Sequence, residues 1–483
     1  MRRIEQEIDE RVGAAAFTQS ALRRPFPDHW SFMLGEIALF CFVILVLTGT
    51  FLSFFYRASS EEVTYLGPYA PLHGQQVTAA YDSVLRLSFE VRAGLVMRQL
   101  HHWAAVVFVG AIVAHLIRVF FTGAFRKPRD VNWVVGFTLL LLGIGAGFTG
   151  YSLPDDLLSG TGLRIAYSAV LSIPVAGTWL ASLLFGGEFP TPDLLSRLTI
   201  LHVMLIPALI AGAMSVHLAL VWRQKHTQFP GPGRTEETVT GSALWPTYAL
   251  KSVGLFFVVA GVLAALAGSF QINPVWLYGP FRPWLSSSPA QPDIYVGWLD
   301  GALRLAPAWE PHVFGHTVPE PFLPGVVVPG VFFTIVALWP FIEARVTRDR
   351  STHHLLQRPR DTPVRSGVGA AGLTFIVILT LAGSNDLLAK AFNVSVETIN
   401  AIDKVALVAG PIVVGWITFR VCRELGRRDL RPVARPGRVR IARTAAGGFT
   451  VREDPHGPSS AAGLRHEAGD AEDRHDGAHQ QDT

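Results

Sequence analysis

Long apolar stretches alternate with polar connections along most of this chain. Eight of them approach or exceed the length of about 20 residues that crosses the hydrocarbon core of a bilayer. We predict eight transmembrane helices, at roughly residues 33–55, 95–120, 133–152, 200–222, 246–268, 324–343, 368–386 and 404–421. The pattern therefore predicts an all-α integral membrane protein.

Composition agrees with a membrane setting, since 50% of the 483 residues are hydrophobic and only 16% are charged. That balance is unusual for a soluble protein of this size, and a lipid bilayer is the expected surrounding, with no nucleic acid partner. Residues 1–30 are charged and lack an apolar core, so no cleavable signal peptide is predicted. Within them Ile4, Ile8 and Val12 recur at helical spacing, which favours an amphipathic surface helix over a flexible tail.

Four histidines lie in the second and fourth predicted spans at nearly matching intervals. His101 and His115 are 14 residues apart, and His202 and His217 are 15 apart. Fourteen residues make nearly four helical turns, so both imidazoles of one span project from about the same face, roughly 21 Å apart in height. Ionisable residues inside a membrane are functional candidates by default. Two such helices side by side would present two opposed histidine pairs, each able to fill both axial positions of a haem iron.

A simpler alternative is that each histidine hydrogen-bonds a neighbouring helix, but the matched pairs favour haem. The two cysteines, Cys41 and Cys422, form neither a CxxCH nor a CxxC motif. This argues against covalent c-type haem, an iron–sulfur cluster and a disulfide framework. We therefore expect two non-covalent b-type haems.

Charge asymmetry between the connections predicts the orientation. The segments after the second span, over 345–365 and over 423–443, are rich in arginine, whereas 57–92 and 153–197 carry more acids than bases. Both termini are therefore expected in the cytoplasm. Spans two and four then run parallel, which predicts that His101 pairs with His202 near the outer surface and His115 with His217 near the inner one. An antiparallel arrangement would instead pair His101 with His217.

Glycines in the first and third spans repeat the histidine interval. Gly35 and Gly49 are 14 residues apart, as are Gly136 and Gly150. A residue without Cβ lets a flat macrocycle lie against the helix backbone, although close helix packing also uses glycine.

Two arginines flank the histidines of the second span. Arg98 lies one turn outward from His101, and Arg118 one turn inward from His115. Each guanidinium is placed toward water, where haem propionates would lie, and snorkelling to lipid headgroups is the alternative.

Several runs together resemble cytochrome b of the cytochrome bc1 family, over about residues 30–365. RQLHHWAAVVFVGAIVAHLIRVFFTGAFRKPRD resembles the family's second helix, and LHVMLIPALIAGAMSVH, with Pro207, its fourth. GYSLPDDLLSG is similar to the stretch after the third helix, and Pro292-Asp293-Ile294-Tyr295 to the Pro-Glu-Trp-Tyr quinol-site motif. PFIEARVTRDRSTHHLLQRPRD is similar to actinobacterial forms in particular.

The resemblance implies a subunit of a respiratory quinol–cytochrome c reductase with two quinone sites. At the outer site, quinol, expected to be menaquinol, would lose two protons and two electrons, with Asp293 as proton acceptor and Tyr295 as hydrogen-bonding or gating partner. One electron would pass to an iron–sulfur partner and the other across both haems to an inner quinone site, contributing to the proton gradient. The expected outer-site residues are Tyr151, Pro154, Pro292, Asp293, Tyr295 and Asp300, with Glu310 a further acidic candidate, and the inner-site candidates are Arg223, Lys225, His226 and Gln228.

The expected partners are a Rieske iron–sulfur subunit, a cytochrome c-type subunit, a second copy of the chain in a homodimer and a terminal oxidase in a supercomplex. The expected location is the cytoplasmic membrane of the cell. Departures from the family pattern matter as well: Asp293 and Ile294 replace the commoner glutamate and tryptophan, so a shorter carboxylate must perform any proton transfer. Desolvation in a membrane pocket raises the pKa of a carboxyl, which would suit proton pickup near neutral pH. Met33 stands where photosynthetic members attach a third haem to cysteine, so only two haems are expected.

The organisation expected from these features has five parts. Residues 1–30 form the cytoplasmic surface helix, 31–225 the di-haem four-helix bundle, 226–244 a cytoplasmic linker, and 245–422 a four-helix domain with the outer quinol-site loop. Residues 423–483, rich in Pro, Gly, Arg and acids, are expected to be a disordered basic cytoplasmic tail. Within 153–197, the resemblance implies short helices roofing the quinol pocket.

Two other classes of protein compete with this interpretation. Another di-haem membrane quinone reductase subunit would also need four helical histidines, but it would lack the Pro-Asp-Ile-Tyr loop. A secondary transporter would show inverted repeats, which the two halves of this sequence do not.

Overall fold

The computed structural model describes residues 19–285, 291–313, 315–430, 439–443 and 449–453. The chain divides into two units, residues 1–424 and 425–483. In the described residues, eight helices are long and apolar enough to cross a membrane, so the predicted number of spans is confirmed. These spans are Leu34–Ser53, Gly94–Phe121, Asp130–Tyr151, Leu194–Gln224, Leu244–Ser269, Leu323–Thr347, Pro363–Ala382 and Val396–Arg427.

Besides the spans, the described residues form shorter helices and strands of two, three or five residues. The helices are α3 (Leu34–Ser53), α4 (Ala79–Phe89), α5 (Gly94–Phe121), α6 (Asp130–Tyr151), α7 (Leu157–Leu171), α8 (Gly177–Phe185), α9 (Leu194–Ile200), α10 (Ile206–Gln224), α11 (Ala249–Ser269), α12 (Val275–Tyr278), α13 (Ile294–Leu305), α14 (Val328–Thr347), α15 (Pro363–Ala382), α16 (Asn385–Phe392) and α17 (Val396–Leu430). The antiparallel strand pairs are β1 (Pro25–Phe26) with β4 (Ser242–Ala243), β2 (Glu62–Thr64) with β3 (Gln76–Thr78), β5 (His312–Val313) with β6 (His316–Thr317), and β7 (Val439–Arg443) with β8 (Phe449–Glu453).

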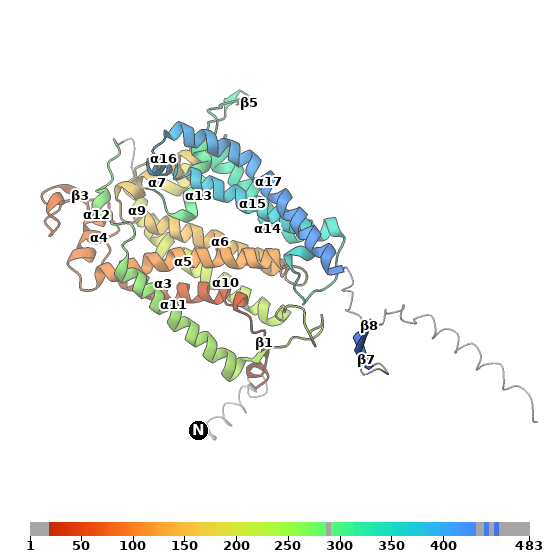
Figure 1. Cartoon of the computed structure of the whole chain (residues 1–483). Helices are drawn as coiled ribbons and strands as arrows, with labels where there is room; N and C mark the ends of the chain where they lie inside the picture. The colour runs from red at the N-terminus through yellow and green to blue at the C-terminus, as the bar shows by residue number, and fades with distance from the viewer. Residues whose placement is uncertain (1–18, 286–290, 314, 431–438, 444–448, 454–483) are drawn as a thin grey trace, which may run out of the picture. The chain divides into compact units, whose positions relative to one another are not determined.

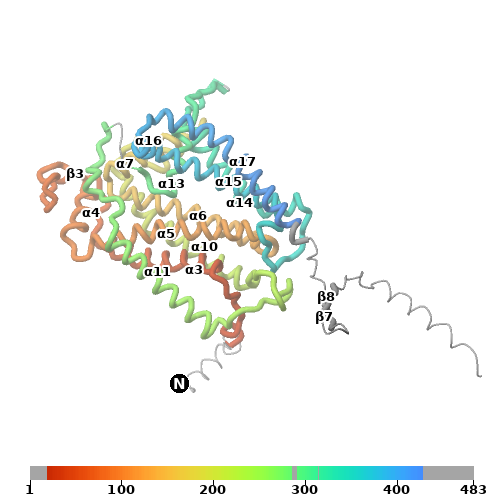
Figure 2. The backbone as a smooth tube through the Cα atoms, viewed as in Figure 1, coloured from red at the N-terminus to blue at the C-terminus, as the bar shows by residue number. Residues whose placement is uncertain are grey.

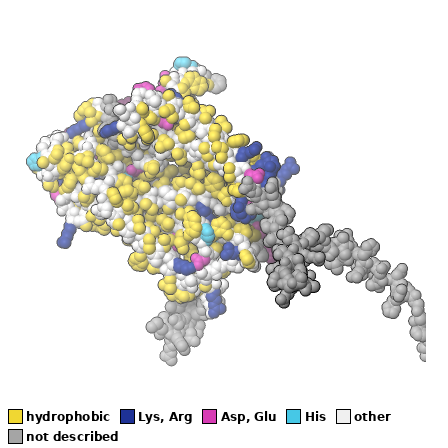
Figure 3. Space-filling model, in the orientation of Figure 1, with side chains coloured by type: hydrophobic (Ala, Val, Ile, Leu, Met, Phe, Trp, Pro, Cys, Tyr) yellow, Lys and Arg dark blue, Asp and Glu magenta, His cyan; other side chains and the backbone are white. Residues whose placement is uncertain are grey.

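Helices α3, α5, α6 and α10 form the four-helix bundle expected from the sequence, and α11 packs against α3 and α5 (Figures 1 and 2). Apolar side chains from all four helices form the core of this bundle. Among them are Cys41, Phe108, Phe137 and Ile210, which are almost fully buried. The spans are apolar on their outer faces too, as the space-filling view shows (Figure 3). Apolar residues all round a helix are what lipid contact requires.

Helix α13 is held against α15 in the second half of the chain. The backbones approach so closely that a Cβ at Gly301 would collide with the carbonyl of Leu379. Trp298 and Ala302 are buried in the same contact. This packing fixes the first turn of α13, which follows Asp293.

The connections are more ordered than the sequence suggested. Between the third and fourth spans, α7 and α8 are the short helices that the family resemblance implied. The 226–244 segment is tied down, because Ser242–Ala243 pairs with Pro25–Phe26 and Gln228 bridges to Leu355. Most of the predicted surface helix, with Ile4, Ile8 and Val12, lies outside the described residues.

The expectation of disorder from residue 423 onward is wrong for part of that segment. Helix α17 ends at Leu430, and β7 and β8 form an antiparallel pair. Composition misled here because it averages over the short VRIAR and FTVRE runs, whose valine, isoleucine, phenylalanine and threonine favour strands. The other residues beyond 430 lie outside the described part of the chain.

Candidate functional site

The four histidines form the two pairs that a parallel arrangement of spans two and four predicts. The ring of His101 lies 6.2 Å from that of His202, centroid to centroid, and the ring of His115 lies 6.4 Å from that of His217. We call these the outer and the inner pair, after the predicted orientation. Either separation leaves room between facing ring nitrogens for one metal ion at about 2 Å from each nitrogen.

A π-helical turn explains the unequal histidine intervals. His202 lies in the turn Leu201–Leu205, between α9 and α10. A π turn closes its hydrogen bond from residue i to i+5, so it holds one residue more than an α turn. The extra residue of the 15-residue interval is absorbed there, and His217 returns to the face that His115 requires.

Each of the four glycines faces one imidazole of the pairs. A Cβ at any of them would press on the Cε1 atom of that ring, at distances of 3.3 Å for Gly35 and His115, 3.1 Å for Gly49 and His101, 3.2 Å for Gly136 and His217, and 2.5 Å for Gly150 and His202. The glycines of α3 therefore make room for the histidines of α5, and those of α6 for the histidines of the fourth span. Glycine at these positions therefore has two reasons: room for the histidine rings, and the room for a macrocycle expected from the sequence.

Threonines orient the outer pair. The Thr48 hydroxyl lies 2.9 Å from Nδ1 of His101, and Nδ1 of His202 lies 3.0 Å from the carbonyl oxygen of Ala146 and 3.3 Å from the hydroxyl of Thr149. With Nδ1 engaged, Nε2 of each ring is left to bind a metal, as second-sphere hydrogen bonds to ligating histidines typically arrange. In the described residues, Nδ1 of His115 and of His217 has no such partner.

The two arginines leave buried N–H groups unpaired. Arg98 donates from Nη2 to the Asn273 carbonyl at 2.6 Å, while its Nε has no partner among the described residues. Arg118 stacks on Phe32, with the guanidinium carbon 4.1 Å from the ring centroid, and its Nε and Nη2 likewise lack partners there. Buried donors without acceptors are rare. The carboxylates of a haem would satisfy them, so the residues present fit that group.

A cavity of about 400 Å³ joins the outer pair to the predicted quinol-site residues. Its walls include His101 and His202 with their glycines, Gly49 and Gly150. The same walls include Arg98, His102, Tyr151, Pro154, Asp156, Asn273, Asp293 and Tyr295.

The Asp293 carboxylate accepts hydrogen bonds from three side chains at this cavity. Its Oδ2 accepts from the Tyr295 hydroxyl at 2.7 Å, and its Oδ1 accepts from Nδ2 of Asn273 and from Nε2 of His102, both at 3.2 Å. Burial pushes the pKa of Asp293 upward, but the hydrogen bonds from these neighbours outweigh it and leave the pKa below its usual value. The expectation of a raised pKa is therefore wrong, because the loop supplies donors that the sequence motif did not reveal.

Two predicted outer-site residues are absent from the cavity walls. Pro292 does not line the cavity, and Asp300 pairs with Arg304 at 2.8 Å. Asp300 follows Tyr295 by five residues on α13, which turns it about 140° away from the tyrosine. Arg304 also bonds Asn385 and Asp386 on α16, so Asp300 belongs to a network on the opposite side of the helix. Glu310 lies in the loop after α13 and is exposed.

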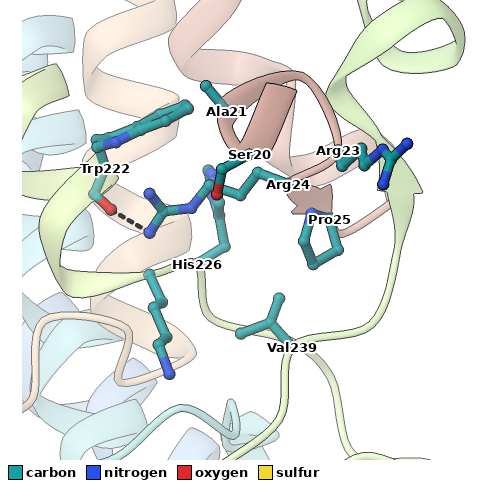
Figure 4. Close-up of a pocket in the computed structure, with 9 residues that line it drawn as sticks. Ser20, Ala21, Arg23, Arg24, Pro25, Trp222, His226 and Val239 are labelled. Atoms are coloured by element: carbon teal, nitrogen blue, oxygen red, sulfur yellow. Dashed lines mark hydrogen bonds between the residues drawn. The ribbon is translucent and has the colours of Figure 1, made fainter. Parts of the chain in front are cut away.

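At the other end of the bundle, a pocket of about 500 Å³ opens beside the end of α10. Figure 4 shows Arg24 against Trp222, where the guanidinium lies 4.4 Å from the ring centroid and donates to the Trp222 carbonyl. Of the predicted inner-site residues, Lys225 and His226 line this pocket and Arg223 does not. Gln228 is buried elsewhere, bonded to the backbone of Thr235, Thr238 and Thr240 in the linker.

His226 is neutral near pH 7. Burial, reinforced by Arg24, Arg129 and Arg118, lowers its pKa to about 4. The imidazole is therefore a hydrogen-bonding group at this pocket, and Lys225 is the cationic side chain among the predicted inner-site residues that line it.

The sequence analysis did not identify three polar residues whose contacts the structure reveals. His102 bonds Asp293, although nothing in the sequence distinguishes a histidine beside His101. Asp156 lines the outer cavity while it caps α7, where its Oδ1 accepts from Ser159 N at 2.8 Å. Glu36 accepts from the Tyr248 hydroxyl and, at 2.7 Å, from Ser252 Oγ between α3 and α11. Glu36 was detectable, since a carboxylate within an apolar span is a signal by itself.

Asp156 and its neighbour Asp155 both hold protons more tightly than usual. Burial raises the pKa of each to about 6, against lowering contributions from Ser159 for Asp156 and from Thr78 for Asp155. The outer end of the bundle therefore combines a carboxylate with a lowered pKa, Asp293, and a pair with raised pKa values.

The sequence and the fold are similar to those of known proteins. A family model described as cytochrome b (N-terminal)/b6/petB matches residues 106–280. Similar proteins include the cytochrome bc1 complex cytochrome b subunits of Mycobacterium leprae, 48% identical over 94% of this chain and 82% of the relative, and of Streptomyces coelicolor, 48% identical over 88% of this chain and 78% of the relative. A solved structure of a hyperthermophilic respiratory complex III shares the fold, with a TM-score of 0.62 at 18% identity over 86% of this chain and 98% of that one.

Proposed function

The chain belongs to the cytochrome b subunits of cytochrome bc1 complexes, and on this premise we propose that it oxidises quinol at the outer cavity around Asp293 and serves a second quinone site at the inner pocket. As a bc1 subunit it is a membrane-embedded component of a quinol–cytochrome c oxidoreductase. Membership of the family also implies haem binding. Which residues perform each task is part of the proposal.

Two haems are assigned to the two histidine pairs. The outer pair, His101 and His202, would hold one iron, and the inner pair, His115 and His217, the other. The unpaired N–H groups of Arg98 and Arg118 would bind carboxylates at either end. When bound, the two haems would supply one-electron transfer along the bundle.

At the outer site, the chain must handle protons from quinol, which releases two protons and two electrons on oxidation to quinone. The Asp293 carboxylate is ionised and buried, and it accepts three hydrogen bonds, which leaves part of its acceptor capacity for a quinol hydroxyl. It is therefore available to accept one proton as a general base, although its lowered pKa gives it a weaker proton affinity than an ordinary aspartate has. Tyr295 and Asn273 hold it in place, and Tyr151 and Pro154 line the same cavity.

At the inner site, reduction of quinone consumes two electrons and two protons from the cytoplasmic side. Lys225 supplies a positive charge beside the pocket and His226 a neutral imidazole. Arg23 and Arg24 add positive charge to the same walls, which favours a ligand that gains electron density.

The quinone is proposed to be menaquinone, and the proposed partners are a Rieske iron–sulfur subunit, a cytochrome c-type subunit, a second copy of the chain and a terminal oxidase. The proposed location is the cytoplasmic membrane with both termini inside. Support for the orientation comes from the arginine-rich connections on one side of the spans.

The observation that carries the assignment is that the four histidines form two pairs, in each of which the two rings lie close together. Each ring also faces a glycine of a neighbouring helix. The test is a pyridine haemochrome and a reduced-minus-oxidised spectrum of the purified complex. We expect two b haems per copy of this chain, both reduced on addition of menaquinol. A single b haem per copy, or b haems that quinol leaves oxidised, would contradict the proposal.

A further inference from the structure

His102 stands beside a proposed haem ligand but points elsewhere. Successive residues of a helix are about 100° apart, so the ring of His102 leaves the His101–His202 pair and reaches the outer cavity. Its side chain is 13% exposed, and its Nε2 lies 3.2 Å from Oδ1 of Asp293, whose own side chain is 6% exposed. Since the ionised Asp293 carboxylate can only accept, the His102 Nε2–H donates this hydrogen bond.

The three donors to Asp293 have different origins. Asn273 and Tyr295 belong, like Asp293, to the segment between the α11 and α14 spans. His102 lies on α5, and it is the one donor that comes from a membrane span among the described residues. The contact therefore ties a carboxylate carried by a loop to the helix turn that carries His101.

We propose that His102 is a positioning residue of the outer quinol site, which fixes the Asp293 carboxylate against α5 at a set distance from the outer histidine pair. The inference rests on the proposed function of Asp293. Without the contact, Asp293 would be held only by groups of its own segment. A general base that is displaced by about 1 Å can lose as much as a hundredfold in rate.

Three substitutions at position 102 separate hydrogen bonding from mere packing. The amide nitrogen of glutamine reaches about as far as Nε2 of histidine, whereas that of asparagine stops near Nδ1. We expect His102→Ala and His102→Asn to lower kcat for quinol oxidation roughly ten- to a hundredfold, with a smaller change in KM. His102→Gln should stay within a few-fold of wild type. Both b-haem spectra should persist in all three variants.

The double variant tests whether His102 acts through Asp293. Because coupled residues are not additive, His102→Ala combined with Asp293→Asn should be no slower than Asp293→Asn alone. A multiplicative loss in the double variant, a glutamine variant as slow as alanine, or loss of a haem band would each overturn the positioning role.

The same measurements separate this inference from the proposed function. Slow turnover of Asp293→Asn beside wild-type turnover of His102→Ala would reject the role of His102 and leave the outer site in place. Wild-type turnover of Asp293→Asn would reject the outer-site assignment itself, and the role of His102 with it.

Discussion

A Cβ atom at Gly150 would lie 2.5 Å from Cε1 and 3.1 Å from Nδ1 of the His202 ring, the tightest of the four glycine–histidine contacts. Gly150→Ala should therefore displace His202 and lower the occupancy of the outer haem. Gly145→Ala, on the same helix, is the matched control, because its Cβ would meet only Ile206 at 4.0 Å. The haem-to-protein ratio of each purified variant is the measurement. Equal haem-to-protein ratios for the two variants would show that the His202 ring can move aside without loss of haem, and would contradict the prediction.

Haem loss should follow the pairs and not the helices. His101→Ala and His202→Ala should remove the same spectral component, and His115→Ala and His217→Ala the other, since the rings meet as outer and inner pairs. Low-temperature reduced-minus-oxidised spectra resolve the two components. The pairing would be wrong if His101→Ala and His115→Ala abolished the same component. The His102 ring turns toward Asp293 and away from the outer pair, so His102→Ala should retain both haem components.

Asp293→Asn should slow quinol oxidation by about ten- to a thousandfold, because the amide cannot accept the proton that a general base takes. Both haem spectra should remain, and reduction of the haems from the inner site should survive. Steady-state turnover with the whole complex measures the first effect. If turnover is unchanged, Asp156 is the next carboxylate to test, since it lines the same cavity and Asp300 does not.

Protonation of Asp155 and Asp156 should be visible between pH 7 and pH 5. Burial raises the pKa of both carboxyls to about 6, so the folded protein binds protons there while an unfolded chain would not. Their contribution to the free energy of unfolding is therefore greatest at low pH and is lost as pH rises through about 6. Infrared spectra should show a protonated carboxyl band that grows as pH falls through 6. The band should shrink in Asp155→Asn and in Asp156→Asn, and a band unaffected by both changes would refute the assignment.

The ion pair between Arg365 and Glu343 joins α15 to α14 and should matter for stability. The Arg365 side chain is 4% exposed, and Glu343 also accepts from Trp339 Nε1 at 2.9 Å. Glu343→Gln leaves a buried guanidinium without its counter-ion, which costs about 3–5 kcal/mol. Lys251→Gln breaks an ion pair with Asp28 in which both side chains are 42% exposed, and it should cost about 0–1 kcal/mol. Thermal unfolding of the solubilised variants measures both, and equal losses would contradict the difference in burial.

Repeating local patterns explain why the sequence predicted the spans, the histidine pairs and the glycines. The length of an apolar stretch identifies a span, because a bilayer has one thickness. The 14-residue interval puts His101 and His115 on one face, because a straight helix has a constant period. The two histidine-bearing spans are separated by one span and therefore run parallel, which predicted the His101–His202 and His115–His217 pairs.

Contacts between distant segments decided the rest. The π turn at Leu201–Leu205 compensates the longer interval before His217, and no residue pattern announces it. His102 and Asp293 are 191 residues apart, and their hydrogen bond, which helps to lower the pKa of Asp293, exists only because α13 is packed against the bundle. The rotation of α13 likewise turns Tyr295 toward the cavity and Asp300 toward Arg304. A sequence motif specifies which groups are available, whereas helix rotation and packing decide which of them meet.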